Sequence, residues 1–331
     1  MKKYLYLLTL LCVSMLSIIT SCGKNDGLTH ITVAEVTHSL FYAPQYIAIN
    51  NGYFKEEGLK VSVITTPGAD KTMAALLSKE AQIGLMGPEA SVYVYNGGET
   101  NYAINFAQLT HKDGSFLLAR EEMPNFKWTD LKGKTIIGGR KGGMPEMTLE
   151  YVLKKAGLQI GQNDPNAEVN IRTDVNFDVM AGVFTAGQSD FVTLFEPSAS
   201  QVERNGIGHI VASIGESSGE VPYTCYSATK KYVEQNGEIL KAFNRAIKKG
   251  INFLLTSKME EVVTALKPSF TSSDEVEISN VINNYLSIDV WNENLSLEKE
   301  SYNRLIEIIT LAGELNEEPA PFEKIVNNSY A

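Results

Sequence analysis

The sequence predicts an α/β fold in two lobes, and three observations lead to this prediction. Short strand-like and helix-like segments alternate from His30 onward, which is typical of a parallel sheet whose strands are joined by helices. The alternation starts again after about residue 115, and after about residue 225 the pattern is helical only. A chain of 331 residues is long enough for two lobes with ordinary cores.

The first part of the chain contains three strand–helix pairs. Apolar residues in alternation or in short runs predict strands at 31–36, 60–64 and 83–86. Helices are predicted at 43–51, 70–78 and 90–95. Gly52 is expected to end the first of these helices, and Asp70 is expected to cap the second.

The later part continues with strands and then becomes helical. Strands are predicted at 134–138, 169–172, 191–194 and 209–214, with a helix at 147–156. Four further helices are expected at 239–256, 259–266, 275–287 and 297–314. The first of them carries an apolar stripe that predicts a core-facing helix: Leu240, Phe243, Ile247, Ile251 and Leu254.

A weak internal repeat supports two related halves. Residues 73–91 and 180–198 each read as a helix, a polar turn and a strand that ends near a Glu beside a Pro. The acids are Glu89, beside Pro88, and Glu196, beside Pro197. The repeat predicts one acid at the carboxyl end of a strand in each lobe, where open parallel sheets bind ligands.

The N-terminus has the pattern of a secretory signal at residues 1–21. Lys2 and Lys3 precede an apolar run, and the segment ends in small residues before Cys22. The pattern resembles a bacterial lipobox, which implies cleavage before Cys22, its acylation, and anchoring on the outer face of the cell membrane. Residues 22–29 then form a flexible leash. The alternatives are an ordinary cleaved signal or a transmembrane anchor, although the run is short for a span.

Composition and motifs exclude several function classes. The formal net charge is −10, which argues against nucleic-acid binding. Cys12, Cys22 and Cys225 are the three cysteines, so no disulfide is expected within the mature chain. No hydrolase or zinc motif is present, and neither a metal nor a cofactor is expected. Residues 138–143, rich in glycine between a strand and a helix, form either a cradle for a polar ligand group or a plain turn.

Several segments together resemble one family of binding proteins. These are residues 38–48, which lead from the first strand into the first helix, the Asn-Gly-Tyr-Phe-Lys-Glu-Glu-Gly-Leu run at 51–59, and segments 128–134, 180–190 and 196–197. Over about residues 30–255 the chain is similar to the sulfonate-, nitrate-, taurine- and thiamine-pyrimidine-binding proteins of ABC importers. The resemblance implies the bilobal type II periplasmic-binding-protein fold, with partners that include a small-molecule ligand and the permease and ATPase subunits.

The same resemblance implies a domain division. The first lobe would contain 28–112 plus 225–331, and the second lobe 113–224, with crossovers near 108–115 and 221–226. Closure of the two lobes would trap the ligand in the cleft between them. The protein is expected to act as a monomer and not as an enzyme.

The candidate ligand contacts from the first lobe are His38, Phe41, Tyr42, Asp70, Glu89 and the loop 110–113; those from the second are Arg140, Met144, Glu146, Glu196 and Tyr223. Phe41 and Tyr42 would stack on a flat ring, and Glu89 and Glu196 would accept hydrogen bonds from an amine. These residues favour a pyrimidine-like or other nitrogenous aromatic ligand.

Three alternatives stay open. Arg140 offers an anion site for a sulfonate, taurine or nitrate. A pyrimidine-synthase-like enzyme is possible on the same fold, but those enzymes carry clustered cysteines, and the body of this chain has only Cys225. A surface adhesin or sensor on the same fold is the third alternative.

Overall fold

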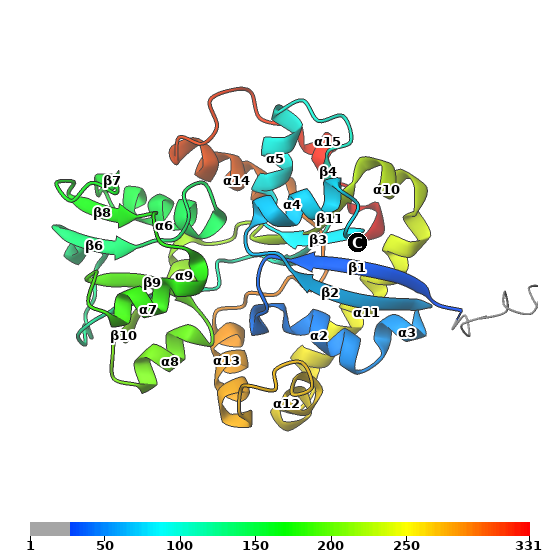
Figure 1. Cartoon of the computed structure of the whole chain (residues 1–331), viewed down its shortest axis with the longest axis horizontal. Coiled ribbons are helices and arrows are strands. Elements are labelled where there is room, and N and C mark those ends of the chain that lie inside the picture. Colours follow the sequence, from blue (N-terminus) through cyan, green and yellow to red (C-terminus); the bar gives the residue numbers. More distant parts are fainter. Residues whose placement is uncertain (1–26) are drawn as a thin grey trace, which may run out of the picture.

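A computed structural model describes residues 27–331, which form two mixed sheets flanked by helices (Figure 1). The α/β fold predicted from the sequence is thereby confirmed. The predicted signal segment and Cys22 lie outside the described residues. Within residues 27–331, no helix has both the length and the apolar character needed to cross a bilayer.

The first sheet has the strand order β2-β1-β3-β11-β4. Its strands are β1 (Thr29–Glu35), β2 (Leu59–Thr65), β3 (Ile83–Met86), β4 (Ala103–Thr110) and β11 (Thr224–Thr229). Strand β1 pairs in parallel with β2 and β3, whereas β11 is antiparallel to both of its neighbours. The connecting helices are η1 (Leu40–Tyr42), α2 (Ala43–Asn50), α3 (Tyr53–Glu56), α4 (Ala69–Leu77) and α5 (Glu89–Asn96).

The second sheet has the order β10-β5-β9-β6-β8-β7. Its strands are β5 (Ser115–Ala119), β6 (Lys134–Ile137), β7 (Ile160–Gln162), β8 (Val169–Arg172), β9 (Phe191–Phe195) and β10 (His209–Ser213). The helical segments around it are η2 (Trp128–Leu131), α6 (Met144–Lys155), η3 (Phe177–Val179), α7 (Met180–Thr185), α8 (Ser198–Arg204) and α9 (Ile214–Ser218). We call the parts of the molecule built on the two sheets the first and the second lobe.

After β11 the chain is helical: α10 (Lys230–Gln235), α11 (Gly237–Thr256), α12 (Met259–Leu266), α13 (Glu275–Ser287), α14 (Lys299–Leu311), α15 (Phe322–Ile325) and η4 (Asn328–Tyr330). The predicted stripe of α11 is buried, as expected, and the helix packs on α2. Gly250 permits this approach, since a Cβ there would lie 2.2 Å from the carbonyl oxygen of Pro44.

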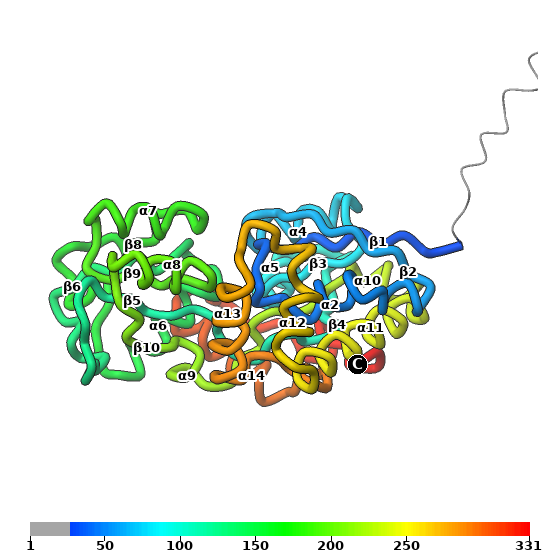
Figure 2. Tube along the Cα trace, turned by 90° about the horizontal axis from the view of Figure 1, so that it is seen from below, coloured from blue at the N-terminus to red at the C-terminus, as the bar shows by residue number. Residues whose placement is uncertain are grey.

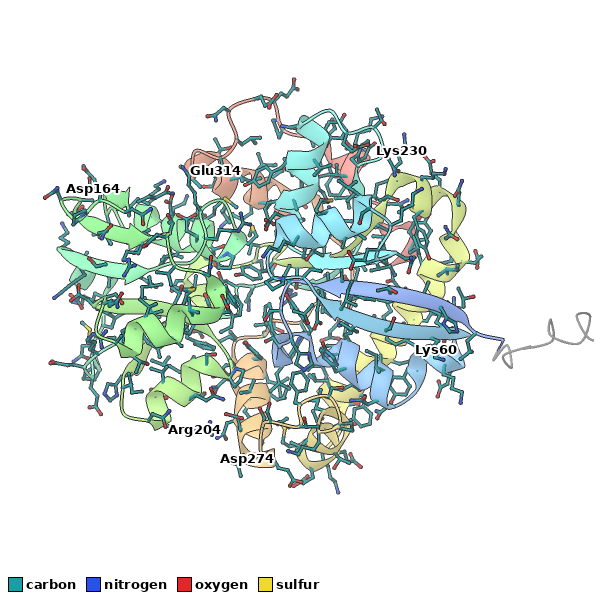
Figure 3. The ribbon with its side chains drawn as sticks, viewed as in Figure 1. Lys60, Asp164, Arg204, Lys230, Asp274 and Glu314 are labelled. Carbon is teal, nitrogen blue, oxygen red and sulfur yellow. The ribbon has the colours of Figure 1, made fainter. Side chains whose placement is uncertain are left out.

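Helix α13 packs on η1 of the first lobe and α14 packs on α6 of the second, and both helices lie near the middle of the molecule (Figure 2). Arg204, labelled in Figure 3, extends from α8 to pair with Glu277 of α13. Arg304 of α14 donates a 2.9 Å hydrogen bond to the hydroxyl of Tyr151 on α6. An ion pair and a hydrogen bond therefore join the C-terminal helices to the second lobe, although the chain enters them from the first sheet.

The chain passes between the sheets twice, at 111–114 and at 219–223, and the two crossovers lie side by side. The amide of Val221 donates to the carbonyl of His111 at 2.9 Å, and that of Tyr223 donates to the carbonyl of Thr110 at 3.1 Å. Gly114 has room for no side chain, because a Cβ there would lie 2.4 Å from the ring of Phe41.

The differences from the predicted elements have physical causes. Strands β4 and β5 are buried at every position, so the period-two alternation that identifies a half-exposed strand is absent from them. Helix α6 begins at Met144 rather than 147, with Pro145 in its first turn, a position that suits proline. The expected cap at Asp70 is wrong: Gly68 is the N-cap of α4, and Asp70 lies within the first turn.

Candidate functional site

The candidate ligand contacts fall into a buried and an exposed group. Phe41, Tyr42, Glu89, Met144, Glu196 and Tyr223 are at most 3% exposed. By contrast, the side chains of His38, Asp70 and Arg140 are 46%, 60% and 50% exposed. The buried residues come from strand ends and turns of both lobes, so the structure brings them together where the lobes meet.

Glu89 is a buried carboxyl group whose hydrogen bonding is incomplete. It begins α5, directly after the turn that follows β3, and it is 2% exposed. Its Oε2 atom has no hydrogen-bond partner among the described residues. Gly87 makes room for the side chain, because a Cβ at Gly87 would lie 2.0 Å from that oxygen.

The electrostatic neighbours of Glu89 come from both lobes. Burial raises the pKa of Glu89 to about 7, while backbone amides, including that of Met144, and the charge of Arg140 act in the opposite direction. Met144 and Arg140 belong to the start of α6 and the glycine-rich turn before it. The carboxyl group thus faces the second lobe, at the N-terminus of a helix.

Tyr42 and Cys225 complete the surroundings of Glu89. Burial raises the pKa of the Tyr42 hydroxyl, and the charges of Glu35 and Glu89 add to the shift. Burial, followed by the charge of Glu89, likewise raises the pKa of Cys225. Both residues are neutral at physiological pH. Cys225, in β11, was not a sequence candidate, because a strand residue gives no sign of which neighbour it meets.

Glu196 is buried as well, but its carboxylate is fully engaged. Oε1 accepts hydrogen bonds from the Ser200 hydroxyl and the Asn284 amide, both at 2.7 Å, and Oε2 accepts from the Ser200 amide at 3.0 Å. These contacts join the start of α8 to α13. Glu196 therefore serves as a structural connection with no unpaired oxygen.

Phe41 is the centre of an aromatic cluster that joins the lobes. Its ring centroid lies 5.2 Å from that of Tyr285, 5.6 Å from Phe195 and 5.9 Å from Tyr223. The indole of Trp291 donates a 2.9 Å hydrogen bond to its carbonyl. With rings around it, Phe41 packs the junction between the lobes.

His38 takes part in a separate network within the first lobe. Its Nδ1 lies 2.7 Å from the Tyr46 hydroxyl, which donates to the carboxylate of Glu35 at 2.5 Å. Its ring stacks on Phe270 at 4.6 Å. The hydrogen bond to Glu35 raises the pKa of His38. The network ties the end of β1 to the segment after α12, away from Glu89.

Asp70 and Arg140 face each other across the lobes, with 3.6 Å between Oδ1 and Nη2. A second pair joins Lys141 of the same turn to Glu314, which follows α14 and is labelled in Figure 3, at 3.5 Å. The hydroxyl of Tyr93 on α5 also reaches the carbonyl of Gly142 at 3.5 Å. The glycine-rich turn is thus held from three sides by the rest of the protein.

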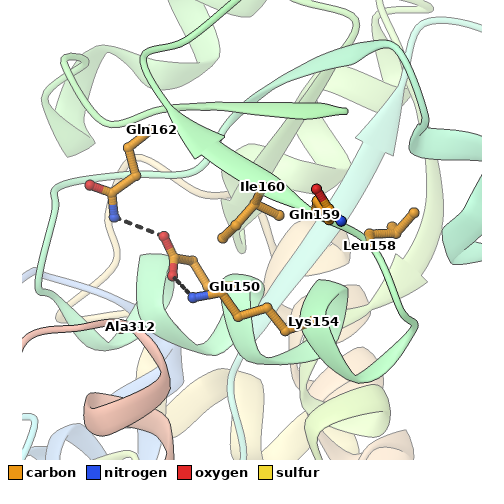
Figure 4. A pocket seen from close by; sticks show the side chains of 7 residues that line it. All are labelled: Glu150, Lys154, Leu158, Gln159, Ile160, Gln162 and Ala312. Carbon is orange, nitrogen blue, oxygen red and sulfur yellow. Dashed lines mark hydrogen bonds and ion pairs between the residues drawn. The ribbon is translucent and has the colours of Figure 1, made fainter. Parts of the chain in front are cut away.

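Glu146 lies behind this turn. The Gly142 amide donates to its Oε2 at 3.3 Å, and Gln162 bridges it to Glu150. Burial and the neighbouring Glu150 raise the pKa of Glu146. Glu150 and Gln162 also line a surface pocket of ≈ 460 Å³ behind α6, with Lys154, Leu158, Gln159, Ile160 and Ala312 (Figure 4). Glu146 therefore stabilises the glycine-rich turn and is not part of the surroundings of Glu89.

A second pocket, of ≈ 700 Å³, lies between α2 and α12 and contains none of the candidates. No group of three or more potential metal ligands occurs in the part of the chain that the structure describes.

Comparison with known proteins places this geometry in a family. The family model described as NMT1/THI5 like matches residues 41–260, more than half of the chain. The putative binding protein YtlA of Bacillus subtilis is 42% identical over 313 residues, which cover 95% of this chain and 92% of YtlA. The formylaminopyrimidine-binding protein of Halalkalibacterium halodurans is 24% identical over 286 residues, covering 83% and 81% of the two chains.

Solved structures agree on the fold. The alkanesulfonate-binding protein SsuA from Xanthomonas axonopodis pv. citri, bound to MOPS, superposes with a TM-score of 0.69 over 91% of this chain and 99% of its own, at 14% identity. At that identity the similarity concerns the fold, which is the periplasmic-binding-protein fold expected from the sequence. From the family match and the 42% identical relative together, the chain belongs to the NMT1/THI5-like family.

Proposed function

We propose that this protein is the substrate-binding component of an ABC importer and captures a neutral or cationic, nitrogen-rich aromatic molecule between its two lobes. A lipid on Cys22 would hold the protein on the outer face of the cell membrane, and the permease and ATPase subunits would be its partners. The family membership and the similarity to binding proteins support the transport role.

The unpaired Oε2 of Glu89 is the single observation that carries the ligand class. A buried carboxylate oxygen without a partner is costly, on the order of 1–3 kcal/mol or more. An amino group or a protonated ring nitrogen would remove that cost by donating a hydrogen bond. Tyr42, whose pKa responds to the charge of Glu89, provides an aromatic face beside the carboxyl group.

The proposed set of ligand contacts is therefore smaller than the set expected from the sequence. Glu89, Tyr42 and the N-terminus of α6 at Met144 form the central set, with Asp70 and Arg140 as a closing pair at the exposed edge. His38, Phe41 and Glu196 support this set through the networks described above.

An anionic ligand is the second candidate. The start of α6 and the guanidinium of Arg140 favour an anion, as would suit a sulfonate or nitrate. However, Arg140 is already paired with Asp70, and the buried carboxyl group of Glu89 faces the same helix start. A second negative charge there would be repelled unless Glu89 were protonated.

An enzymatic role on this fold has less support. Cys225 is the only cysteine among residues 27–331, and it is buried with a raised pKa, which disfavours the reactive thiolate.

Thermal-shift screening of purified protein tests the ligand class. The panel contains pyrimidines, thiamine precursors, aromatic amines, taurine, alkylsulfonates and nitrate. We expect stabilisation by amino-substituted rings. Stabilisation by sulfonates or nitrate alone, abolished by Arg140→Ala and unchanged by Glu89→Gln, would establish the anionic alternative.

The anchor is tested separately in the host. Metabolic palmitate labelling and fractionation should place the full-length protein in the membrane fraction, with the label lost in Cys22→Ala. A wild-type protein that takes no label and fractionates as soluble would contradict the anchor without affecting the ligand proposal.

A further inference from the structure

Helices α8 and α13 face each other across the boundary between the lobes. Helix α8 packs on β9 and β10 of the second sheet, whereas α13 packs on α12 and on η1 of the first lobe. Arg204, the last residue of α8, lies beside Asp274, the N-cap residue of α13 (Figure 3). The contacts between these two helices therefore change when the lobes move relative to each other.

Glu277, in the first turn of α13, is a buried carboxylate that takes two hydrogen bonds from the other lobe. Its Oε1 accepts from the guanidinium of Arg204 and, at 2.9 Å, from the side-chain amide of Gln201, both on α8. Burial acts to raise the pKa of Glu277, but hydrogen bonds from Gln201, Ser273 and Arg204 outweigh it, and the pKa is lowered. The carboxylate is therefore ionised and held by two side chains of the second lobe.

The face of α8 that meets α13 is polar. Ala199 and Val202 are the buried residues of α8, and Gln201 and Arg204, three residues apart, share a different face of the helix. The lobes can therefore separate along this face without exposing an apolar surface. Interfaces between domains that move are typically more polar than a permanent core.

The other end of α13 is attached to the first crossover. The amide of His111 donates to the carbonyl of Val290, and that of Asn292 donates to the carbonyl of Leu109, both at 2.9 Å. At a rise of 1.5 Å per residue, Glu277 lies about 16 Å along the helix from this attachment. The contact of Glu277 with α8 is therefore far from the pivot, where opening of the lobes displaces the partners most.

A second ion pair between the lobes is more exposed. The side chains of Arg140 and Asp70 are 50% and 60% exposed, with 3.6 Å between their charged atoms. The side chain of Glu277 is only 7% exposed, although that of Arg204 is 44% exposed. Exposed ion pairs contribute little, whereas charge-assisted hydrogen bonds to a shielded carboxylate contribute more. The contact of Glu277 with α8 is therefore the stronger of these two connections.

We propose that Gln201, Arg204 and Glu277 form a latch between the lobes that favours their closed arrangement. This inference rests on the proposed function, because closure of the lobes is how that function captures its ligand. Gln201 and Arg204 are positioning residues, which act on the separation of the lobes and not on the ligand itself. Loss of the latch should favour the open form and weaken binding of any molecule that requires the closed one.

Single-molecule FRET on purified, ligand-free protein tests the latch. The dyes are attached through Glu80→Cys and Glu122→Cys, at exposed positions of the first and the second lobe, since Cys225 is buried. An interaction made in only one of two states shifts their ratio by its own free energy, so Glu277→Gln and Arg204→Ala should each lower the closed-to-open ratio about fivefold.

Two further variants make the test specific. Arg204→Lys should restore part of the ratio, because lysine keeps the charge but lacks the planar guanidinium. Glu168→Gln is the matched control. Glu168 accepts from Lys132 and from the amide of Gln159, each at 2.8 Å and both within the second lobe, so its loss should leave the ratio unchanged.

The outcomes separate the latch from the proposed function. If Glu277→Gln and Arg204→Ala lower the unfolding temperature but leave the closed-to-open ratio unchanged, the contact is structural and the inference is overturned. A single interlobe distance that neither variant changes, or an equal effect of Glu168→Gln, would also overturn it. None of these results bears on the ligand screen. If that screen supports only anions while both variants open the lobes, the proposed ligand class fails and the latch stands.

Discussion

The turns that follow β3 and β9 look alike in sequence but place their glutamates in opposite situations. In the first lobe Glu89 follows Pro88 and begins α5, and one of its oxygens has no partner among the described residues. In the second lobe Glu196 precedes Pro197, and three hydrogen bonds to Ser200 and Asn284 occupy its carboxylate. Similar turns in a repeat therefore need not give their acids the same surroundings.

The difference follows from the position relative to the proline: Glu89 lies one residue after Pro88, whereas Glu196 lies one residue before Pro197. A glutamate before the helix reaches forward to the amide of Ser200, as an N-capping side chain does. A glutamate that is itself the first helical residue folds back over Gly87. The first acid keeps one oxygen without a partner among the described residues, and the second joins the start of α8 to α13.

Removal of the engaged glutamate should have the largest effect on stability. Glu196→Ala leaves the Asn284 amide and the Ser200 donors without their acceptor, so we expect a loss of about 3 kcal/mol in the free energy of unfolding. Urea denaturation measures this, with the exposed Glu122→Ala as the control. A loss as small as the control's would show that the two glutamates are not as different as the contacts indicate.

Glu89→Gln should act on binding instead. The ligand loses a hydrogen bond to a charged acceptor, about 1.5–3 kcal/mol, so the dissociation constant should rise roughly ten- to a hundredfold. The compound with the greatest stabilisation in the screen serves as the titrant. Comparable weakening by Glu196→Gln in protein that remains folded would remove the distinction between the two turns.

The pH dependence of stability should sharpen the comparison. The pKa of Glu89 is raised to about 7 in the folded protein, and burial likewise raises that of Asp113 to about 7. A group whose pKa is raised in the folded state contributes to stability at low pH. That contribution is lost as the pH rises from the pKa of the group in the unfolded chain through its pKa in the folded protein. For each of these two groups, the free energy of unfolding of the ligand-free protein should therefore fall by about 2 kcal/mol between pH 5 and pH 8.

Thermal unfolding of ligand-free protein across this range measures the slope. Glu89→Gln should reduce the decline only in part, because Asp113 and Glu146, whose pKa values are also raised, still contribute. A slope unchanged by Glu89→Gln would mean that Glu89 is ionised throughout the range, and its carboxylate would then have a partner.

The smallest effect is expected at the exposed pair between the lobes. Arg140→Ala should change the unfolding free energy by less than about 1 kcal/mol, because exposed ion pairs contribute little. Binding of a cationic ring should be preserved or slightly strengthened. Abolished binding would show that Arg140, and not Glu89, provides the charged contact with the ligand.

The sequence predicted the α/β class and the strands and helices with clear periodicity. Strands β3 and β8 and helices α12 and α13 were predicted at their observed bounds. The two helices have one face in the core and one toward solvent, which gives a local periodicity, whereas β3 is buried at every position and was predicted from its short apolar run. The wholly buried β4 and β5 have no such pattern, and β11 shares this property, with only Thr229 partly exposed.

The candidate site depended on information that the sequence does not contain. The sequence was enough to predict that Glu89, Glu196 and Tyr42 lie near strand ends, because that position depends only on neighbouring residues in the chain. Which carboxylate is free was decided by Asn284 and Ser200, and one of these lies on a helix distant in the chain. Likewise, Asp113 and Tyr223 are far apart in sequence and meet only because β4 and β11 pair in the sheet. Hydrogen-bond saturation is a property of the folded packing, because each donor can satisfy only the acceptors that the tertiary structure brings within about 3 Å.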